Sequence, residues 1–488
     1  MVVLNTDDKL PCSSFAEYFS GNADVLHAQP LQEPVNANEG RPSSNRSAKE
    51  LDLALLDDIR DELEGDITCR LGSLTISKLP LEDALENKQL FIEHPPLFSN
   101  RIALEPSINN QSKSYLCWNY AGLNMMRFKL MEQYNLAEFD FSKAYLFFYD
   151  KVEKANWFLE NVLSTLDQSL DSRLVQCIFA KPVNDPAQWS MFVPLIEKYG
   201  MVPYSAYPDT YHNLDPAHLV TLLSSVVREF ALHLRNEYAN GKSVEELRTK
   251  KAGMIKEVYR IMTITNMSPP KKFTWAFYDR DGTFHEFKDI TPLKFYKDYM
   301  RFDCLQTVSL YNDPRNEYMR KLKVGYTGSV VGGQKIDQLN VPMSEIKRLA
   351  AKLVMAGHPL WFASDVSKLV SLNGIADTNI FDYKTAFNAK YNLTKAERMQ
   401  CLESHPTHVM VLTGVHIEDS KIVRWQAENS FGKEFGNNGY LTITDKWFDE
   451  YVYQMVVMKS ELSQEMLDAL ENDTIVLPPW DITSIWYV

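Results

Sequence analysis

Apolar residues recur with helical spacing along much of the first half of the chain. Residues 117–134 carry apolar faces with Lys and Arg in the later turns, which predicts a helix. Residues 141–166 form a second helical region, rich in aromatic side chains, and residues 193–199 end at Gly200, a frequent helix terminator. Residues 216–264 keep the helical period and are highly charged.

The second half of the chain has the alternation typical of strands. Residues 273–278 and 283–287 flank a turn that contains Asp281-Gly282, which predicts a β-hairpin. Further elements are expected as strands at 359–363, 409–415, 422–428 and 450–458 and as a helix at 343–355. Because helices come first and strands later, the pattern indicates an α+β fold rather than alternating βαβ units.

The first 50 residues differ from both halves. The run from Asn36 to Asn45 is polar, rich in turn formers and without an apolar period, so residues 1–50 are expected to be a flexible arm. Leucines among charged residues over 47–63 then predict an amphipathic helix.

Length and composition add a broad class. The 488 residues, 45% of them hydrophobic, are typical of a globular protein of two or three domains. No apolar run approaches the roughly eighteen residues that a membrane span needs. The first ten residues lack the basic-then-apolar layout of a secretory signal. We therefore expect a cytoplasmic protein without a membrane anchor.

Cysteine usage and charge narrow the chemistry. The six cysteines are scattered without a Cys-x-x-Cys pair, so free thiols are a better interpretation than disulfides. Metal-ligand spacing is absent as well, and we expect neither a metal nor another cofactor. The formal net charge of −13 is unfavourable for general nucleic-acid binding. A net charge does not exclude a local basic patch.

Cys117 stands at the start of a predicted helix, directly before Trp118. The positive end of a helix dipole favours the thiolate, which is the reactive form of cysteine. Gln111 lies upstream, where its amide could donate to an oxyanion together with the backbone N–H of Cys117. On these residues alone, a small buried hydrophobic cysteine is the commoner interpretation.

A polar turn at residues 418–420 joins two of the predicted strands. Antiparallel pairing centred there would place His408 opposite Asn429, with β-carbons about 5 Å apart. The Asn429 amide oxygen could then hold the imidazole ring and its tautomer, and a thiolate–imidazolium pair with Cys117 would follow. Without the Asn429 partner, a structural histidine would be the better interpretation.

These residues and further motifs resemble the bleomycin hydrolase (aminopeptidase C) family of papain-like cysteine peptidases, over about residues 50–481. The motifs are Asn110-Gln111 with Cys117-Trp118, Phe141–Lys151, Asp171–Gln176, Glu197–Gly200, Asn312–Arg315, Val331–Gly333, Thr407–Met410, Glu428–Gly432, Gly439-Tyr440, Thr444–Phe448 and Leu477–Asp481. Carried over by position, the resemblance implies Cys117 as the nucleophile and His408 as the general base. It implies Asn429 as the residue that orients the base and Gln111 as the oxyanion donor.

The resemblance also implies an organisation and an activity. The expected segments are the arm at 1–50, a helical half with the nucleophile at 51–215, an oligomerisation insertion of helices and a hairpin at 216–345, a β-rich half with His408 and Asn429 at 346–470, and a C-terminal arm at 471–488. Family members form hexamers whose C-terminal arm lies in the cleft and restricts them to aminopeptidase action. A homohexamer that acts on short peptide substrates is therefore implied.

The sequence departs from the family near the expected substrate path. Tyr115 stands where the family has a glycine, Pro186 and Ala187 replace two further glycines, and Val409 replaces an alanine. Together with Trp118 these are the candidate cleft residues. Two interpretations compete: altered specificity in a working enzyme, or a divergent paralogue with weak or no peptidase activity that serves as a binding or scaffold protein. The retained catalytic groups favour the enzyme.

Overall fold

The computed structural model describes residues 50–484, which form two compact units. The predicted arm at 1–50, with Cys12, and the last residues of the C-terminal arm, 485–488, therefore lie outside the described residues, apart from Glu50. The smaller unit contains α2 (Leu53–Gly65), α3 (Ile67–Ile76), α4 (Leu81–Leu85) and α15 (Tyr383–Phe387). The helix predicted over 47–63 corresponds to α2, and neither α2 nor α3 buries a residue. All candidate site residues lie in the larger unit.

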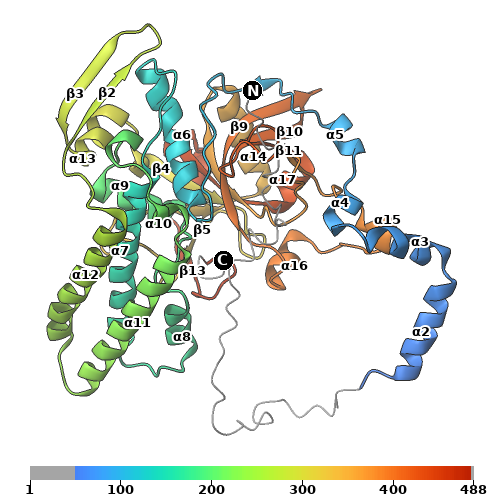
Figure 1. Ribbon diagram of the computed structural model, residues 1–488, viewed down its shortest axis with the longest axis horizontal. Helices are drawn as coiled ribbons and strands as arrows, with labels where there is room; N and C mark the ends of the chain where they lie inside the picture. Colours follow the sequence, from blue (N-terminus) through green and yellow to red (C-terminus); the bar gives the residue numbers. More distant parts are fainter. Residues whose placement is uncertain (1–49, 485–488) are drawn as a thin grey trace, which may run out of the picture. The chain divides into compact units, whose positions relative to one another are not determined.

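The helical half of the larger unit contains long and short helices, and side chains cap the starts of some of them. The helices are α5 (Gln89–Glu93), α6 (Cys117–Gln133), α7 (Lys143–Leu163), α8 (Arg173–Ala180), α9 (Trp189–Tyr199), α10 (Tyr211–Leu214), α11 (Ala217–Ala239) and α12 (Val244–Asn266), as Figure 1 shows. Ser142 caps α7 by accepting from a backbone N–H, and Ser243 with Glu246 forms a capping box at α12. The region 216–264 therefore contains two helices, because the capping box at Ser243 begins a new helix after the end of α11.

Two glycines fix turns that the sequence predicted. Gly200 ends α9 with φ 73°, and a β-carbon there would lie 2.2 Å from the backbone carbonyl carbon of Pro292, so no other residue fits. Gly282, with φ 79°, lies in the turn of the hairpin formed by β2 (Phe273–Tyr278) and β3 (Phe284–Ile290). The predicted hairpin is confirmed. Short helical segments follow at α13 (Pro292–Lys294), η2 (Phe295–Met300) and η3 (Cys304–Gln306), and η1 (Tyr204–Ala206) lies earlier in the chain.

The other half of the larger unit is built around one mixed sheet. Its strand order is β13-β5-β6-β4-β12-β7-β9-β10-β11-β8, and β1 pairs with β9. The strands are β1 (Asn100–Arg101), β4 (Thr307–Tyr311), β5 (Arg320–Val324), β6 (Gln338–Asn340), β7 (Leu360–Ser364), β8 (Ile375–Ala376), β9 (His408–Glu418), β10 (Lys421–Glu428), β11 (Tyr440–Thr444), β12 (Val452–Met458) and β13 (Thr474–Leu477). The helical elements between them are α14 (Met343–Met355), α16 (Lys395–Gln400), α17 (Asp445–Tyr451), η4 (Lys459–Glu461) and α18 (Gln464–Ala469). Helices followed by strands make the fold α+β, as the pattern predicted.

The β9–β10 hairpin departs from the predicted register. Its turn consists of residues 419–420, which have φ values of 47° and 63°, and the ladder pairs Glu428 with Val411. The predicted ladder pairing of His408 with Asn429 is therefore wrong. The turn lies one residue later than predicted. A two-residue turn of the mirror-image type needs two left-handed residues, and the apolar pattern does not show where they are.

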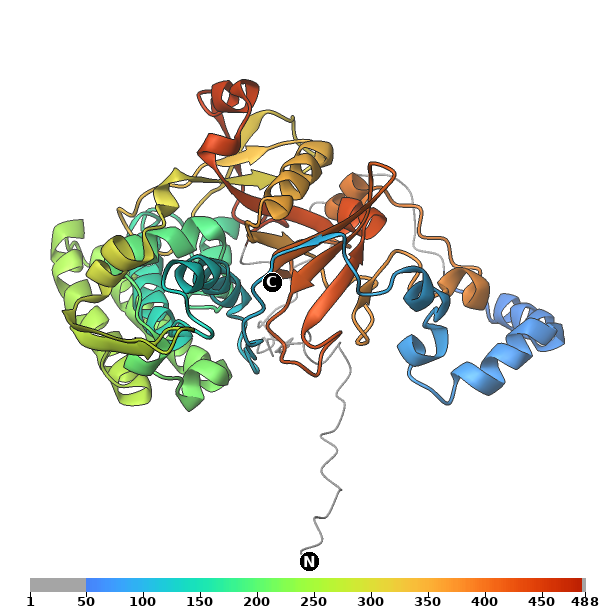
Figure 2. The same ribbon diagram turned by 90° about the horizontal axis from the view of Figure 1, so that it is seen from above.

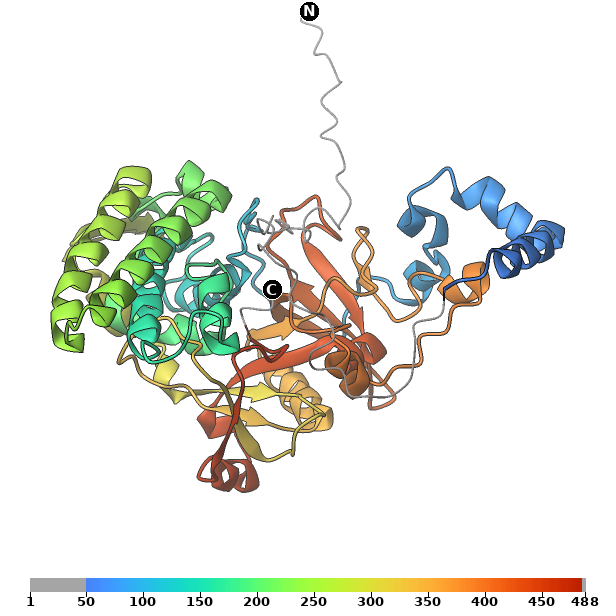
Figure 3. The ribbon, with the colours of Figure 1, turned by 90° about the horizontal axis from the view of Figure 1, so that it is seen from below.

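One apolar core joins the helices to the sheet. Helix α6 is buried along most of its length and packs directly against β9. Trp118 of α6, Trp361 of β7 and Val409 of β9 belong to the same core. Figures 2 and 3 show the long helices gathered on one side of the larger unit and the strands β9 and β10 on the other. Among the described residues, no helix has both the length and the apolar composition of a membrane span.

Candidate active site

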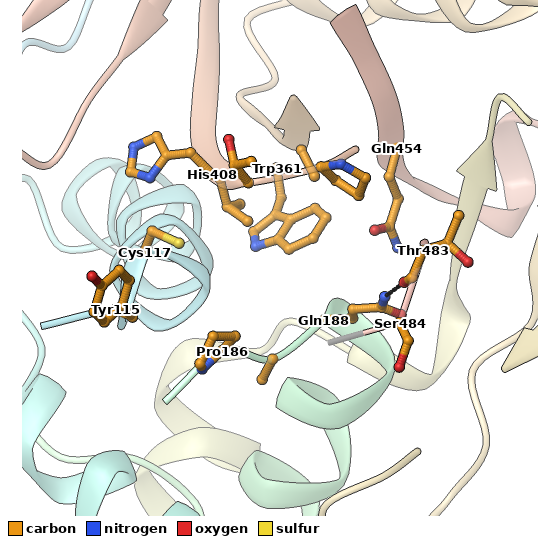
Figure 4. Close-up of a pocket in the computed structure, with 14 residues that line it drawn as sticks. Tyr115, Cys117, Pro186, Gln188, Trp361, His408, Gln454, Thr483 and Ser484 are labelled. Carbon is orange, nitrogen blue, oxygen red and sulfur yellow. Dashed lines mark hydrogen bonds between the residues drawn. The ribbon is translucent and has the colours of Figure 1, made fainter. Parts of the chain in front are cut away.

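A pocket opens between the start of α6, the loop before α9 and the strands β7 and β9. Its empty volume is about 520 Å³, including the part that opens to solvent. Within the described chain it is lined by Tyr115, Cys117, Pro186, Ala187, Gln188, Trp361, Ala363, Pro406, Thr407, His408, Val409, Gln454, Thr483 and Ser484 (Figure 4). The fold thus brings the candidate nucleophile and the candidate base, which are far apart in sequence, to one site.

Cys117 is the first residue of α6, so its half-buried thiol lies at a helix N-terminus. Burial raises the pKa of this thiol to about 11, while backbone N–H groups of Val409, Trp118 and Cys117 itself act in the opposite direction. The interaction with Val409 places the sulfur beside the residue that follows His408. Figure 4 shows Cys117 and His408 at the same end of the pocket.

The His408 side chain is held by an amide and by an aromatic ring. Its Nε2 lies 2.8 Å from the Oδ1 of Asn429, and Phe431 stacks on the imidazole with ring centroids 4.5 Å apart. Because an amide oxygen only accepts hydrogen bonds, Nε2 carries the hydrogen and Nδ1 is the basic nitrogen. The side chains therefore meet as predicted, although the ladder register does not bring the two backbones opposite each other.

Burial shifts the pKa values of Cys117 and His408 in opposite directions. Burial lowers the pKa of His408 to about 4, against the hydrogen bond with Asn429, which raises it. Together with the raised pKa of Cys117, this favours an uncharged thiol beside an uncharged imidazole at neutral pH. A neutral imidazole is the form that a general base needs.

Gln111 lies in the loop before α6 and is tied to the segment that follows Asn429. Its backbone N–H donates to the carbonyl of Ser430 at 2.8 Å, and its side-chain oxygen accepts from the Ser430 hydroxyl at 2.7 Å. Its side-chain nitrogen donates to the carbonyl of Ser114 at 2.7 Å. An amide nitrogen carries two N–H groups, and this hydrogen bond uses one of them. Gln111 is buried behind the residues that line the pocket.

The predicted cleft residues fall into two groups. Tyr115, Val409 and the loop residues Pro186 and Ala187 line the pocket. Trp118 does not: it is fully buried, and its indole Nε1 donates at 2.9 Å to the carbonyl of the residue before Pro186. Trp118 therefore lies beneath the cleft and supports it, instead of forming its wall.

The described end of the chain also reaches the pocket. Thr483 and Ser484 line it, and the carbonyl of Thr483 accepts from the side chain of Gln188 at 2.9 Å. Arg315 binds the carboxylate of Asp481 at 2.9 Å. These contacts fix the segment that precedes the last four residues.

A cluster of buried charges behind the loop 184–187 was missed by the sequence analysis. Lys151 and Lys154 of α7 form ion pairs with Asp185 at 2.7 Å and with Asp150 at 3.0 Å, respectively. Burial lowers the pKa of Lys154 to about 8, although Asp150 opposes the shift. The available signal was a run of charges inside an otherwise aromatic helix, which periodicity alone assigns to a solvated face.

A second buried ion pair joins the two halves of the site. Arg127 of α6 and Glu428 of β10 are 2.7 Å apart, and Asn124 donates to the same carboxylate oxygen at 2.9 Å. Burial raises the pKa of Glu428, and Arg127 opposes this shift. Since Glu428 directly precedes Asn429, the pair ties α6, which begins at Cys117, to the residue that holds the imidazole.

The arrangement offers a thiol at a helix start and an imidazole held by an amide, with backbone N–H groups beside the sulfur. Acyl transfer through a thioester needs this set of groups, so the site indicates a cysteine peptidase. Within residues 50–484, no group of Asp, Glu, His and Cys is arranged to hold a metal ion.

The chain belongs to the Peptidase C1-like family, whose model matches residues 50–484. It is 39% identical over 414 residues to bleomycin hydrolase from Gallus gallus, an alignment that covers 82% of this chain and 91% of the relative. It is 38% identical over 410 residues to aminopeptidase C from Listeria monocytogenes, covering 83% of this chain and 92% of the relative. The crystal structure of pepw from Lactobacillus rhamnosis matches with a TM-score of 0.87 at 37% identity, covering 89% of this chain and 98% of that one. The predicted family and papain-like fold are confirmed.

Proposed function

We propose that the protein is a cysteine aminopeptidase that removes N-terminal residues from short peptides. The observation that carries this proposal is the pocket in which Cys117 lies beside His408, whose imidazole Asn429 holds at 2.8 Å. Relatives that are similar over most of the chain are named bleomycin hydrolase and aminopeptidase C, which supports the same class of reaction.

In the proposed reaction, His408 takes the thiol proton of Cys117 as the sulfur attacks the carbonyl carbon of the scissile bond. The backbone N–H of Cys117 and the side-chain N–H of Gln111 donate to the oxyanion that forms. The C–N bond then breaks, and His408 gives its proton to the leaving amine, which leaves a thioester on the sulfur. Water, deprotonated by His408, attacks the thioester, releases the carboxylic acid and regenerates the thiol.

The described end of the chain supports a restriction to peptide N-termini. Thr483 and Ser484 occupy the end of the pocket next to Gln188, where contacts of Asp481 and Thr483 fix them. A peptide that extended beyond this end would collide with the segment, whereas a peptide that begins in front of it would fit. The restriction is therefore steric.

Release of a fluorescent amine from aminoacyl reporters tests the proposal. Cys117→Ala is expected to lower kcat/KM by at least about 10⁴-fold, because no other group replaces the nucleophile. Cys401→Ala, which changes an exposed free cysteine, is the matched control and is expected to keep the wild-type rate. Equal rates for wild type and Cys117→Ala on a broad reporter panel would refute the peptidase proposal and leave the binding or scaffold role.

A second reporter pair tests the restriction to N-termini. The same aminoacyl reporter with an acetylated α-amine removes the free N-terminus and adds bulk where Thr483 and Ser484 lie. Wild-type protein is expected to cleave the free reporter and not the acetylated one. Comparable cleavage of both would indicate endopeptidase action instead.

A cytoplasmic homohexamer is the assembly that the family resemblance supports. Helices α2 and α3 bury no residue, and their exposed apolar side chains, among them Leu53, Leu63, Leu71 and Leu74, offer surface that self-association would cover. Light scattering of the purified protein is expected to give the mass of six chains. A monomer at micromolar concentration, or recovery in a membrane fraction, would contradict this assignment.

A further inference from the structure

The loop 184–187 forms one wall of the pocket and is held from behind by two lysines of α7, Lys151 and Lys154. Lys154, with a side chain only 3% exposed, donates through Nζ to the carbonyls of Asn184 at 2.8 Å, Asp185 at 3.1 Å and Pro186 at 3.0 Å. Its three N–H donors are shared among these carbonyls and the Asp150 carboxylate at 3.0 Å, and Lys151 also donates to the Asn184 carbonyl at 3.0 Å. No role in the proposed reaction uses Lys154.

The same loop is joined to the residues on either side of the nucleophile. The indole Nε1 of Trp118 donates to the carbonyl of Asp185 at 2.9 Å, and the backbone N–H of Tyr115 donates to the Asp185 carboxylate at 3.4 Å. The ammonium of Lys154 lies 5.7 Å from the centre of the Trp118 ring. Lys154 therefore fixes the wall relative to Cys117.

These contacts determine what the wall presents to a ligand. The carbonyls of residues 184–186 are directed to the buried ammonium, and Pro186 has no N–H to donate. A peptide against this wall therefore meets the Pro186 and Ala187 residues, while Lys154 engages the carbonyls of residues 184–186.

The rest of the lining carries no carboxylate, ammonium or guanidinium group within the described residues. Trp361, Ala363 and Val409 add apolar surface, and the polar side chains of Gln188 and Gln454 are neutral. No Asp, Glu, Lys or Arg lines the pocket within the described residues. A charged side chain bound here would lose its hydration without gaining a counter-ion, which is unfavourable.

We propose that Lys154 is a positioning residue that fixes loop 184–187 as an apolar wall, and that this wall selects peptides with an apolar side chain next to the scissile bond. The proposal rests on the proposed peptidase function, because it names the substrate class of that site. Lys154 itself touches no substrate and acts through the carbonyls that it holds.

Protection of Cys117 against iodoacetamide measures binding without hydrolysis. Leucinamide is the probe, and the readout is the concentration that halves the alkylation rate of Cys117. Lys154→Met is expected to raise this concentration about tenfold and to leave the alkylation rate without leucinamide within about twofold. On a leucyl reporter the same variant should raise KM about tenfold with little change in kcat.

Lys251→Met is the matched control. Lys251 is a mostly buried lysine of α12 that pairs with Glu160 of α7, the helix that carries Lys154, and it does not line the pocket. It is expected to keep wild-type protection. Unchanged protection in Lys154→Met, or a parallel loss of alkylation and protection, would overturn the positioning role.

Pro186→Ala tests the wall while the buried lysine remains in place. The substitution restores an N–H and removes the apolar ring. An apolar wall predicts that leucinamide protects about threefold less well. Stronger protection would mean that main-chain hydrogen bonds dominate recognition, and the proposal would fail.

A comparison of leucinamide with lysinamide on the wild-type protein tests the substrate class. Leucinamide is expected to protect at a concentration about tenfold lower, and equal protection would contradict the apolar selection. Because none of these protection measurements requires turnover, they separate the two proposals. Absence of reporter cleavage refutes the peptidase function, whereas unchanged protection in Lys154→Met refutes the role of the wall.

Discussion

Two loops line the pocket, and the two halves of the fold hold them in opposite ways. Loop 184–187 comes from the helical half, where the buried ammonium of Lys154 donates hydrogen bonds to the backbone carbonyls of residues 184–186. Loop 404–407 comes from the sheet half, where the fully buried carboxylate of Asp365 accepts from the Ser404 hydroxyl at 2.7 Å and from the backbone N–H of His405 at 3.3 Å. A cation thus fixes one wall through acceptors, and an anion fixes the other through donors.

The difference lies in how each buried charge is compensated. Lys154 is part of a cluster in which the two lysines are balanced by Asp150 and Asp185. The donors that Asp365 receives from loop 404–407 are uncharged hydroxyl and backbone N–H groups. We infer that the helical wall depends on charge balance, whereas the sheet wall depends on the direction of individual hydrogen bonds.

The largest expected effect concerns the buried Arg127–Glu428 ion pair, which joins the helical half to the sheet half. Glu428→Gln removes the charge opposite Arg127 and leaves the guanidinium buried without compensation. The free energy of unfolding, measured by urea denaturation, is expected to fall by about 3–5 kcal/mol.

Glu345→Gln provides a control for this change. Glu345 pairs with Arg348 at 2.8 Å, but both side chains are at least 34% exposed. An exposed pair of this kind contributes about 0–1 kcal/mol, so the control should remain close to wild type. Equal effects of the two substitutions would show that the Arg127–Glu428 pair does not hold the halves together.

The next effect is the loss of folding stability at acidic pH that His408, on the sheet side of the pocket, is expected to cause. The pKa of His408 is about 4 in the folded chain and 6.5 for a solvent-exposed histidine, so between these values the unfolded chain binds the additional proton. Stability from the neutral imidazole is therefore complete above pH 6.5 and is lost as the pH falls to 4, by about 3 kcal/mol in total. His408→Gln should remove this part of the acid slope in urea denaturation curves, and a slope equal to that of wild type would contradict the assignment.

The sequence predicted much of the site because its main residues lie in recognisable local patterns. Cys117 begins the predicted helix, and His408 and Asn429 lie at the ends of predicted strands and make the predicted side-chain contact. The ladder register was wrong because the positive φ values at residues 419–420 leave no trace in apolar periodicity.

The support of the walls could not be predicted, for a different reason. Lys154 and Asp365 are charged residues that are buried, and in a single sequence they look the same as charged residues on a solvated face. Their partners are backbone carbonyls and small hydroxyl groups from distant segments, which become visible only when the chain is folded. Trp118 is the opposite case. Its position next to Cys117 in the sequence predicted a cleft residue, but its ring lies in the core.

The smallest effect tests the directional character of the sheet wall. Asp365→Asn keeps the shape of the side chain but turns one acceptor oxygen into an NH₂ group, which then faces a donor. Since the carboxylate receives hydrogen bonds on both oxygens, from Ser404 and His405 on one and from Thr407 on the other, either orientation of the amide loses contacts. We expect the free energy of unfolding to fall by about 2 kcal/mol and kcat/KM on a leucyl reporter to fall about tenfold. A fall in stability without any change in kcat/KM would mean that loop 404–407 does not position His408, and the two walls would then differ in function as well as in charge.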